Sequence, residues 1–375
     1  MIKKILITLC LFCTLFIVCA ITAGAEDIDY VVGLLSAVGI TDGDIQADGD
    51  SIVTRAQFIT YINRELNLNI EHNPVTPKFT DVSEGYWAYN DIIIAESLKL
   101  IYGDNNGKFY PDEPIVLSEA LNIVLRALNY NNIMEYDKTS NVMVLASELG
   151  LLDEIKAEQD MPLTLENTYR LLYNSLDADM ADIISFSGNG TAIYKKKSGK
   201  TILSEYHDIY YIMGIVQADE YSMLYGKKAN AGSILIDDVE YKGAKKQIEN
   251  LIGLKVKCYY KKNTIDERNI VYIYKYNNNE VNFTFEDIND FNGSKFKVES
   301  DNKVNSYNIN AKSTILLNKN IVLNIKDVKN AIAENAGNIR LIDNNGDDIY
   351  EVVIINSYYN MIVQSFDCDT LTISG

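Results

Sequence analysis

Three apolar stripes at helical spacing constrain the fold of this chain more than any other feature. The stripes consist of Phe58, Ile62 and Leu66; of Leu117, Leu121, Val124, Leu125 and Leu128; and of Leu165, Tyr169, Leu172 and Leu176. Each stripe predicts an amphipathic helix. Each follows a loop containing Gly or Asp and an earlier apolar helix, so the pattern indicates an internal repeat of helix pairs. One such pair cannot bury its apolar face alone, whereas three pairs around a common axis can.

Two of these helices have recognisable start signals. Thr54 is followed three residues later by Gln57, the spacing of a capping box, in which each side chain satisfies a free backbone N–H group at the helix start. Thr164 precedes the third stripe and is expected to act as its cap.

The second half of the chain has a different composition and predicts β structure. All five prolines precede residue 163, and Tyr-rich alternating segments follow residue 190, so we place a boundary at residues 178–190. Alternation predicts strands at residues 254–260 and 270–276 and a hairpin from 339–342 to 349–355. A short helix is expected at 326–333. The fold class is therefore α+β and multidomain, with an N-terminal helical bundle followed by one or more β-rich modules of sheet or barrel type.

The last residues resemble an earlier segment of the same chain. Residues 359–364 echo residues 211–217, which suggests that a further β unit starts near residue 358 and is cut off at Gly375, or that residues 358–375 form a closing strand.

The first residues are typical of a secretory signal peptide. Lys3 and Lys4 precede an apolar run at residues 5–20, and small residues at 23–25 predict cleavage before Glu26. An uncleaved membrane anchor is the alternative, which the shortness of the run disfavours. After cleavage no integral membrane segment is expected.

Charge and cysteine content exclude several classes of protein. A formal net charge of −18 without a Lys/Arg cluster disfavours nucleic-acid binding. Three of the five cysteines lie in the signal peptide, leaving Cys258 and Cys368. One disulfide between them is compatible with the sequence, but two buried free thiols are favoured because both lie in strand-like segments.

Residues 79–128 carry a specific family resemblance. An aromatic opening with Asp81, a Trp at position 87 before an apolar run, Gly103, a Phe-x-Pro motif at 109–111 and Glu119 occur in the order seen in S-layer homology repeats of exported Gram-positive, clostridial-type proteins. In this resemblance Gly103 corresponds to the glycine that ends the first helix. Residues 71–134 would form the second repeat, 26–70 and 135–180 two degenerate repeats, and 190–357 the β-rich domain.

The resemblance implies binding to a secondary cell-wall polysaccharide, which in this family often carries a pyruvate ketal. Grooves between repeats would hold the sugar through the tentative site residues Arg55, Asp81, Trp87 and Glu119. Arg offers a planar fork of donors to a carboxylate, acidic side chains accept hydroxyl groups, and aromatic rings stack on sugar faces. The positions equivalent to Arg55 hold Leu117 and Leu165, so at most one groove keeps its cation.

Each of these residues also has a purely structural interpretation. Trp87 is expected to pack in the core more often than to contact sugar, because a Trp that starts an apolar helix is usually buried. Asp81 is expected to order a turn, Glu119 suits the N-terminal end of a helix dipole, and Arg55 fits a solvated first-turn residue.

No catalytic or metal signature was found in the sequence. The oxygen-rich stretches 104–107 and 343–348 lack the spacing of an EF-hand, and tight turns explain both. No zinc spacing, phosphate loop or nucleophile elbow occurs, so no metal, cofactor or catalytic residue is predicted.

These observations lead to a non-enzymatic, exported surface protein with a wall-binding helical part and an outward β-rich module of S-layer or adhesin type. Self-assembly is an additional expectation. A wall-active enzyme targeted by the helical part, or a purely structural assembly subunit, are the alternatives.

Overall fold

The computed structural model describes most of the chain and divides it into two compact units. The described residues are 28–42, 49–68, 79–130, 141–186, 192–195, 199–276, 278–300, 303–334, 336–358, 365–367 and 372–374. The units are Met1–Asp208 and Ile209–Gly375, and each is considered by itself. The predicted signal peptide lies outside the described residues. Within the described ranges, none of the helices has the length and apolarity needed to span a bilayer.

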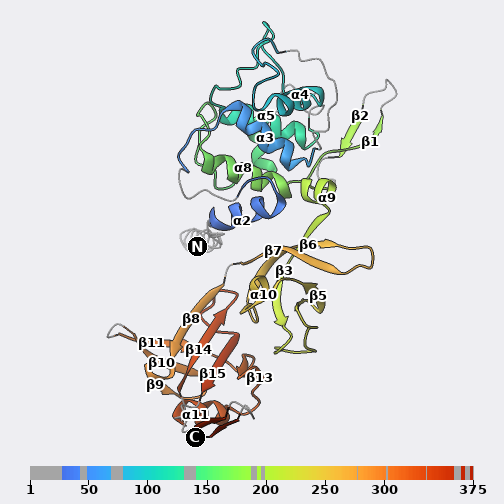
Figure 1. The fold of residues 1–375 in the computed structure, drawn as a ribbon. Helices are drawn as coiled ribbons and strands as arrows, with labels where there is room; N and C mark the ends of the chain where they lie inside the picture. The colour runs from blue at the N-terminus through green and yellow to red at the C-terminus, as the bar shows by residue number, and fades with distance from the viewer. Residues whose placement is uncertain are drawn as a thin grey trace, which may run out of the picture. The chain divides into compact units, whose positions relative to one another are not determined.

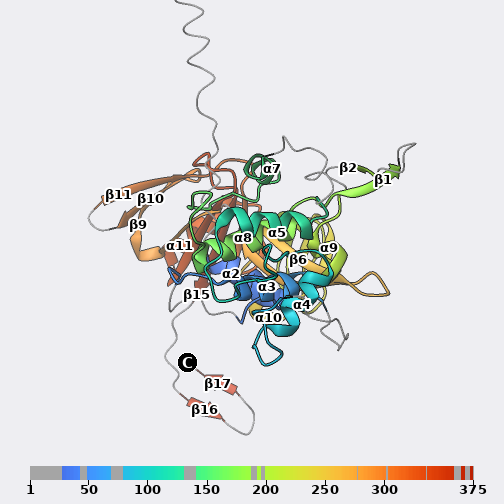
Figure 2. The same cartoon turned by 90° about the horizontal axis from the view of Figure 1, so that it is seen from above.

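The first unit is a helical bundle (Figures 1 and 2). Its main helices are α2 (Ile28–Val38), α3 (Arg55–Glu65), α4 (Tyr89–Ser97), α5 (Leu117–Ala127), α7 (Val142–Glu148) and α8 (Leu165–Asp177). Helix α3 contacts both α5 and α8. Each of the three remaining helices packs on one of these: α4 on α3, α7 on α5 and α2 on α8. The three predicted stripes supply the buried faces of α3, α5 and α8, and Leu165 is the one stripe residue that is only partly buried.

Three short extended segments join the helices at the centre of this bundle. The Val53 N–H donates to the Leu163 carbonyl at 3.0 Å, the Leu163 N–H to the Ile115 carbonyl at 2.9 Å, and the Ile115 N–H to the Val53 carbonyl at 3.1 Å. The hydrogen bonds thus form a closed ring of three. Each segment leads directly into α3, α5 or α8, so the ring fixes the starts of these helices relative to one another.

The predicted caps of α3 and α8 are confirmed. The Thr54 hydroxyl accepts from the Gln57 N–H, and the Gln57 side chain accepts from the Thr54 N–H, which completes the capping box. The Thr164 hydroxyl accepts from the Asn167 N–H at the start of α8.

The turn after α4 differs from the expectation for Gly103. The helix ends at Ser97, and Lys99 takes the left-handed conformation with φ +59°, as Gly39 and Gly150 do after α2 and α7. Gly103 lies further along and does not end the helix. It is needed instead for a close approach, because a Cβ at this position would lie 2.8 Å from the Phe79 ring.

The first unit extends beyond the predicted boundary. A hairpin of β1 (Asp182–Phe186) and β2 (Ala192–Lys195) precedes the short helix α9 (Ile202–His207). The His207 side chain lies 2.7 Å from the Glu65 carbonyl oxygen, which ties α9 to α3. The division therefore falls after Asp208, whereas composition alone suggested residues 178–190.

The second unit begins with a closed five-stranded barrel in the order β3-β4-β5-β7-β6. Its elements are β3 (Ile209–Ala218), β4 (Ser233–Ile236), β5 (Val239–Lys242), α10 (Lys245–Ile248), β6 (Lys255–Lys262) and β7 (Arg268–Lys275). The predicted pairing of residues 254–260 with 270–276 is confirmed, with Cys258 opposite Ile273. Cys258 is a buried free thiol as expected, while Cys368 lies outside the described residues.

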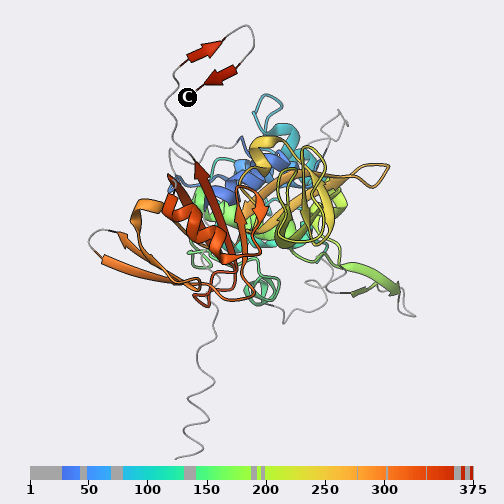
Figure 3. The ribbon, with the colours of Figure 1, turned by 90° about the horizontal axis from the view of Figure 1, so that it is seen from below.

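A five-stranded sheet in the order β13-β12-β15-β14-β8 follows the barrel. Its strands are β8 (Asn279–Thr284), β12 (Thr314–Leu317), β13 (Asn320–Ile321), β14 (Ala336–Asp343) and β15 (Val352–Tyr358). The predicted hairpin is the antiparallel β14–β15 pair, and the predicted short helix is α11 (Ile325–Glu334), orange-red in Figure 3.

The remaining strands form two small sheets. A short 3₁₀ turn, η1 (Phe285–Asp287), leads to the sheet of β9 (Ile288–Phe291), β10 (Lys295–Ser300) and β11 (Lys303–Asn308). Strands β16 (Ser365–Asp367) and β17 (Thr372–Ser374) pair with each other.

Candidate functional site

Arg55 is held between two helices and a loop. As the first residue of α3, it donates its N–H to the Glu113 carbonyl at 2.9 Å. Its Nη1 lies 2.9 Å from Glu119 Oε2, and its Nε donates to the Phe109 carbonyl at 2.9 Å. The guanidinium carbon lies 4.8 Å from the centre of the Phe109 ring. The side chain is only 16% exposed, so Arg55 is a positioned cation and not the freely solvated residue of the structural interpretation.

Glu119 combines two roles at the start of α5. It is the third residue of that helix, and its Oε2 lies 3.5 Å from the Val116 N–H, a long contact at the helix start. The same oxygen pairs with Arg55. Glu119 is 47% exposed, so a carboxylate oxygen remains accessible beside the cation.

Asp81 orders the loop that Arg55 contacts. Its carboxylate accepts from the Phe109 N–H at 2.9 Å and from the Tyr110 N–H at 2.8 Å. Tyr110 has φ +60°, a conformation that is costly for a side-chain-bearing residue and is held here by these hydrogen bonds. The turn-ordering interpretation of Asp81 therefore describes its contacts. Arg55 and Asp81 both contact the loop at residues 109–110, and Glu119 is joined to this loop through its ion pair with Arg55.

Trp87 is exposed, so the expectation that it packs in the core is wrong. Its side chain is 61% exposed. It lies in the turn before α4, where Ala88 and Ile92 fill the core in its place. The Trp87 ring lies beside the Tyr86 ring at 5.8 Å between centroids, and the Tyr86 hydroxyl donates to Asp112 Oδ1 at 2.7 Å. Trp87 is thereby linked to the loop that Asp81 and Arg55 hold.

The same loop carries a second ordered acidic turn. Asp104 Oδ1 accepts from the Asn106 and Lys108 N–H groups, and Asp104 Oδ2 accepts from the Tyr110 hydroxyl at 2.9 Å. These hydrogen bonds, that from Lys108 foremost, lower the pKa of Asp104. The turn interpretation of residues 104–107 is consistent with this network.

The positions equivalent to Arg55 lack a cation. Leu117 and Leu165 begin α5 and α8, and their N–H groups donate to Met161 and Ser51, as Arg55 donates to Glu113. Leu117 is fully buried. Of these three helix starts, only that of α3 presents a charged donor.

The site also contains groups that sequence reasoning missed. The Phe109 carbonyl, the Tyr110 backbone and the Tyr86–Asp112 pair connect the predicted residues, but none was singled out. The Phe-x-Pro motif at 109–111 was the available signal, since it marks the loop on which they meet. The left-handed backbone of Tyr110 has no signal in the residue type.

An acidic group in the second unit resembles a cation site in composition. Carboxylate oxygens of Asp343, Asp347 and Glu351 lie within 4.8 Å of one another. Asp343 is fully buried, and it accepts from the N–H groups of Asn345 and Gly346. These hydrogen bonds account for a tight turn between β14 and β15.

Comparison with known proteins agrees with the family resemblance. Residues 78–120 match the profile of the S-layer homology domain. The chain is 36% identical over 126 residues to a "Cell surface protein" of Thermoanaerobacter kivui, covering 32% of this chain and 16% of the relative. It is 24% identical over 184 residues to a "Middle cell wall protein" of Brevibacillus brevis, covering 48% of this chain and 17% of the relative. It is 25% identical over 177 residues to a "Surface layer protein" of Brevibacillus choshinensis, covering 47% of this chain and 15% of the relative.

The matches span less than a fifth of the length of each of these relatives. They agree with the predicted S-layer homology module and with the predicted location outside the cell. Residues 78–120 are therefore an S-layer homology domain, and the chain that carries it is a cell-surface protein.

Proposed function

We propose that this chain is a non-enzymatic surface protein anchored non-covalently to a secondary cell-wall polysaccharide by its helical unit. The β-rich unit is the displayed part. The proposal rests on one observation above all. Arg55 is fixed at a junction of α3 and α5, beside an exposed carboxylate, in the part of the chain that contains the S-layer homology domain.

The ring of hydrogen bonds through Val53, Ile115 and Leu163 supports three repeats in the helical unit. We assign the repeats to residues 26–70, 71–134 and 135–180. The cyclic packing of α4 on α3, α7 on α5 and α2 on α8 gives each repeat the same neighbours. In this proposal, each junction between repeats is an equivalent binding position, and these positions differ in the residues at the helix starts.

The chemistry of the Arg55 groove suits an acidic sugar. Nε and Nη1 contact Phe109 and Glu119, which leaves Nη2 for a ligand carboxylate such as that of a pyruvate ketal. The positive end of the α3 dipole lies at the same point and favours an anion. The exposed oxygen of Glu119 is an acceptor for a sugar hydroxyl.

Two aromatic residues of the middle repeat, the exposed Trp87 and the partly buried Tyr86, supply an apolar platform. Trp87 and Tyr86 lie side by side, and Tyr86 is fixed by its hydrogen bond to Asp112. Partial burial and the contact with Asp112 raise the pKa of Tyr86 to about 12, so the hydroxyl remains a neutral donor. Such rings stack on the C–H face of a sugar. With Leu117 and Leu165 at the other helix starts, binding is concentrated in one groove.

The proposal is tested by co-sedimentation with cell-wall sacculi. The mature protein should sediment with sacculi that keep their secondary polysaccharide and should stay in solution with stripped peptidoglycan. Arg55→Ala should reduce the bound fraction severalfold, whereas Lys156→Ala, which removes an exposed charge in the third repeat, should not. Equal sedimentation with both kinds of sacculi would refute wall-polysaccharide anchoring.

A further inference from the structure

The five-stranded sheet of the second unit has one apolar face and one mixed face. Phe283, Ile339 and Val353 point to the apolar face, which packs on the β9–β11 sheet and on α11. Their neighbours along each strand point the other way, because side chains alternate. The mixed face therefore carries polar residues of β8, β14 and β15.

Pairing between the strands aligns these polar residues. Asn338 on β14 is opposite Asn356 on β15 and Thr284 on β8, and Arg340 is opposite Asn282. Three amides, one hydroxyl and one guanidinium thus share a continuous patch of the sheet.

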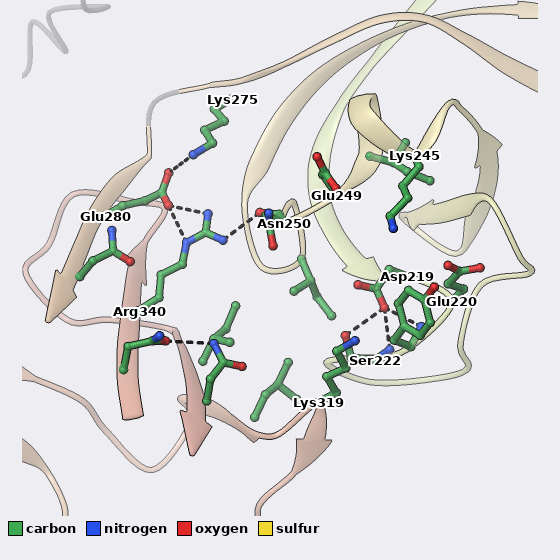
Figure 4. A pocket seen from close by; sticks show the side chains of 18 of the residues that line it. Asp219, Glu220, Ser222, Lys245, Glu249, Asn250, Lys275, Glu280, Lys319 and Arg340 are labelled. Carbon is green, nitrogen blue, oxygen red and sulfur yellow. Dashed lines mark hydrogen bonds and ion pairs between the residues drawn. The ribbon is translucent and has the colours of Figure 1, made fainter. Parts of the chain in front are cut away.

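Only part of the mixed face is covered by the barrel. Leu316, Ile342 and Val352 at one end of it join the barrel core with Ile252 and Leu254. Beside this contact lies a cavity of about 1000 Å³, with the polar patch as one wall (Figure 4). This volume is at the upper end of the range of roughly 300–1,000 Å³ that is usual for small-molecule sites.

The opposite wall comes from the barrel. It includes residues 219–222 of the β3–β4 connection and the end of α10. In Figure 4, Asp219, Glu220 and Lys245 lie on this side, and Glu280 and Arg340 on the sheet side.

The charged groups of the sheet wall are already neutralised and fixed. Arg340 Nε lies 2.6 Å from Glu280 Oε2, and Arg340 Nη1 donates to the Asn250 carbonyl at 2.8 Å. Lys275 Nζ also contacts Glu280 at 2.8 Å. Arg340 and Glu280 are only 16% and 18% exposed, so this group forms a preorganised edge of the cavity.

Several polar groups of the cavity remain available. The side chains of Asn282 and Glu249 make no hydrogen bond or ion pair with the described residues of this unit, and Lys245 interacts with Glu220 only through its charge. Asn356 donates to Asn338 at 3.0 Å, which leaves its own carbonyl oxygen to accept. Tyr221 is 50% exposed, with Lys319 Nζ 4.0 Å from the centre of its ring.

The charge balance of the cavity narrows the class of ligand. Four cations, Lys245, Lys275, Lys319 and Arg340, stand against five carboxylates. The cavity is thus almost neutral, so it offers no net positive charge that would attract a polyanion. Amide groups offer a donor and an acceptor together, as paired hydroxyl and acetamido groups of a sugar require. Ile248, Ile354 and the other apolar lining residues suit its C–H faces.

We propose that this cavity binds an uncharged oligosaccharide, a second carbohydrate site distinct from the Arg55 groove. The site is independent of the wall-anchoring proposal, because it lies in the other unit and has a different charge. It would allow the displayed unit to hold a neutral surface glycan while the helical unit holds the wall polymer.

The probe is the N-acetylglucosamine tetramer, which is uncharged and presents both hydroxyl and acetamido groups. Calorimetric titration into the full mature chain should give saturable binding. Asn282→Ala should weaken binding about tenfold or more without changing the thermal unfolding, because the Asn282 side chain is exposed. Asn305→Ala, an exposed amide on β11 away from the cavity, is the matched control and should bind as the parent chain does.

A second pair of probes separates sugars from other ligands. A tetrapeptide stem of peptidoglycan and a carboxylated oligosaccharide, polygalacturonate, should bind much more weakly than the tetramer. Absence of saturable binding of the tetramer, equal binding by the Asn282→Ala chain, or preference for the peptide or the polyanion would each overturn the proposal. Arg55→Ala should leave this titration unchanged, so its result is separable from that of the wall-binding test.

Discussion

Nη1 of Arg55 lies 2.9 Å from Oε2 of Glu119, which joins the first turn of α3 to the first turn of α5. The pair is asymmetric, since Arg55 is largely buried and Glu119 is about half exposed. Arg55 also donates to the Phe109 carbonyl, so its position does not depend on Glu119 alone. In the proposed complex, a ligand would share the cation while Arg55 keeps its contacts with the protein.

The contribution of this pair to stability should be small. Partly exposed ion pairs usually contribute roughly 0–1 kcal/mol. A double-mutant cycle with Arg55→Ala and Glu119→Ala, followed by urea unfolding, should therefore give a coupling free energy of about 0.5–1 kcal/mol. A coupling of several kcal/mol would mean that Arg55 is mainly structural and would weaken its assignment to ligand binding.

Trp87 should report binding by fluorescence, because it is the only Trp in the chain. Its exposure predicts a red-shifted emission and efficient quenching by acrylamide in the free protein. Stacking on a sugar should shift the emission to the blue and reduce quenching. Emission typical of a buried indole in the free protein would contradict the exposed position, and unchanged quenching at saturating wall polymer would remove Trp87 from the site.

Gly103 should tolerate no side chain. A Cβ at this position would lie 2.8 Å from the buried Phe79 ring, which packs on Phe109. Gly103→Ala should destabilise the helical unit by about 1–3 kcal/mol, the usual cost of overpacking. Gly85→Ala is the control, since its Cβ would meet no atom within 4 Å. Equal unfolding midpoints for the two variants would contradict the close approach.

Glu65 should make the helical unit progressively less stable as the pH rises from about 5 to 8. Burial raises the pKa of Glu65 from 4.5 to about 8, and the hydrogen bond from Ser175 at 2.5 Å opposes this rise in part. A raised folded-state pKa means that the folded chain holds the proton more tightly. The corresponding stability is fully present below pH 4.5 and is lost as the pH rises through about 8.

Replacement of Glu65 by Gln should remove this dependence. Between pH 5 and pH 8, the parent chain should lose on the order of 3 kcal/mol of unfolding free energy that the Glu65→Gln chain keeps. Urea unfolding followed by far-ultraviolet circular dichroism at the two pH values measures the difference. Parallel losses in the two chains would show that Glu65 does not titrate as its burial implies.

Local features of the fold were predictable from sequence, and features set by distant packing were not. The capping box of Thr54 and Gln57 and the β14–β15 hairpin depend on neighbours in the chain, so spacing revealed them. Trp87 is exposed, whereas Ala88 and Ile92 of the same segment are the residues that fill the core. The role of Gly103 depends on its close approach to Phe79, and helix α4 separates these two residues in the sequence.

In the candidate sites, too, features marked by local sequence were predictable and features set by distant packing were not. Arg55 and Glu119 could be found because a family motif marks both. Their ion pair, however, depends on the ring of hydrogen bonds that positions the starts of α3 and α5. The cavity in the second unit was not foreseen. It requires β8 to pair with β14, although about 60 residues separate Asn282 from its partner Arg340. Alternation of apolar and polar residues shows which side chains share a face of a strand, but it does not show which strands pair with it.

Titration of purified secondary wall polysaccharide into the mature chain tests the central claim most directly. The account predicts saturable binding, which Arg55→Ala weakens about tenfold or more and Arg55→Lys weakens less. Removal of the acidic groups from the polymer should weaken its binding to the parent chain to a similar extent. Binding of equal strength by the parent and Arg55→Ala chains, or no binding to the intact polymer, would contradict it.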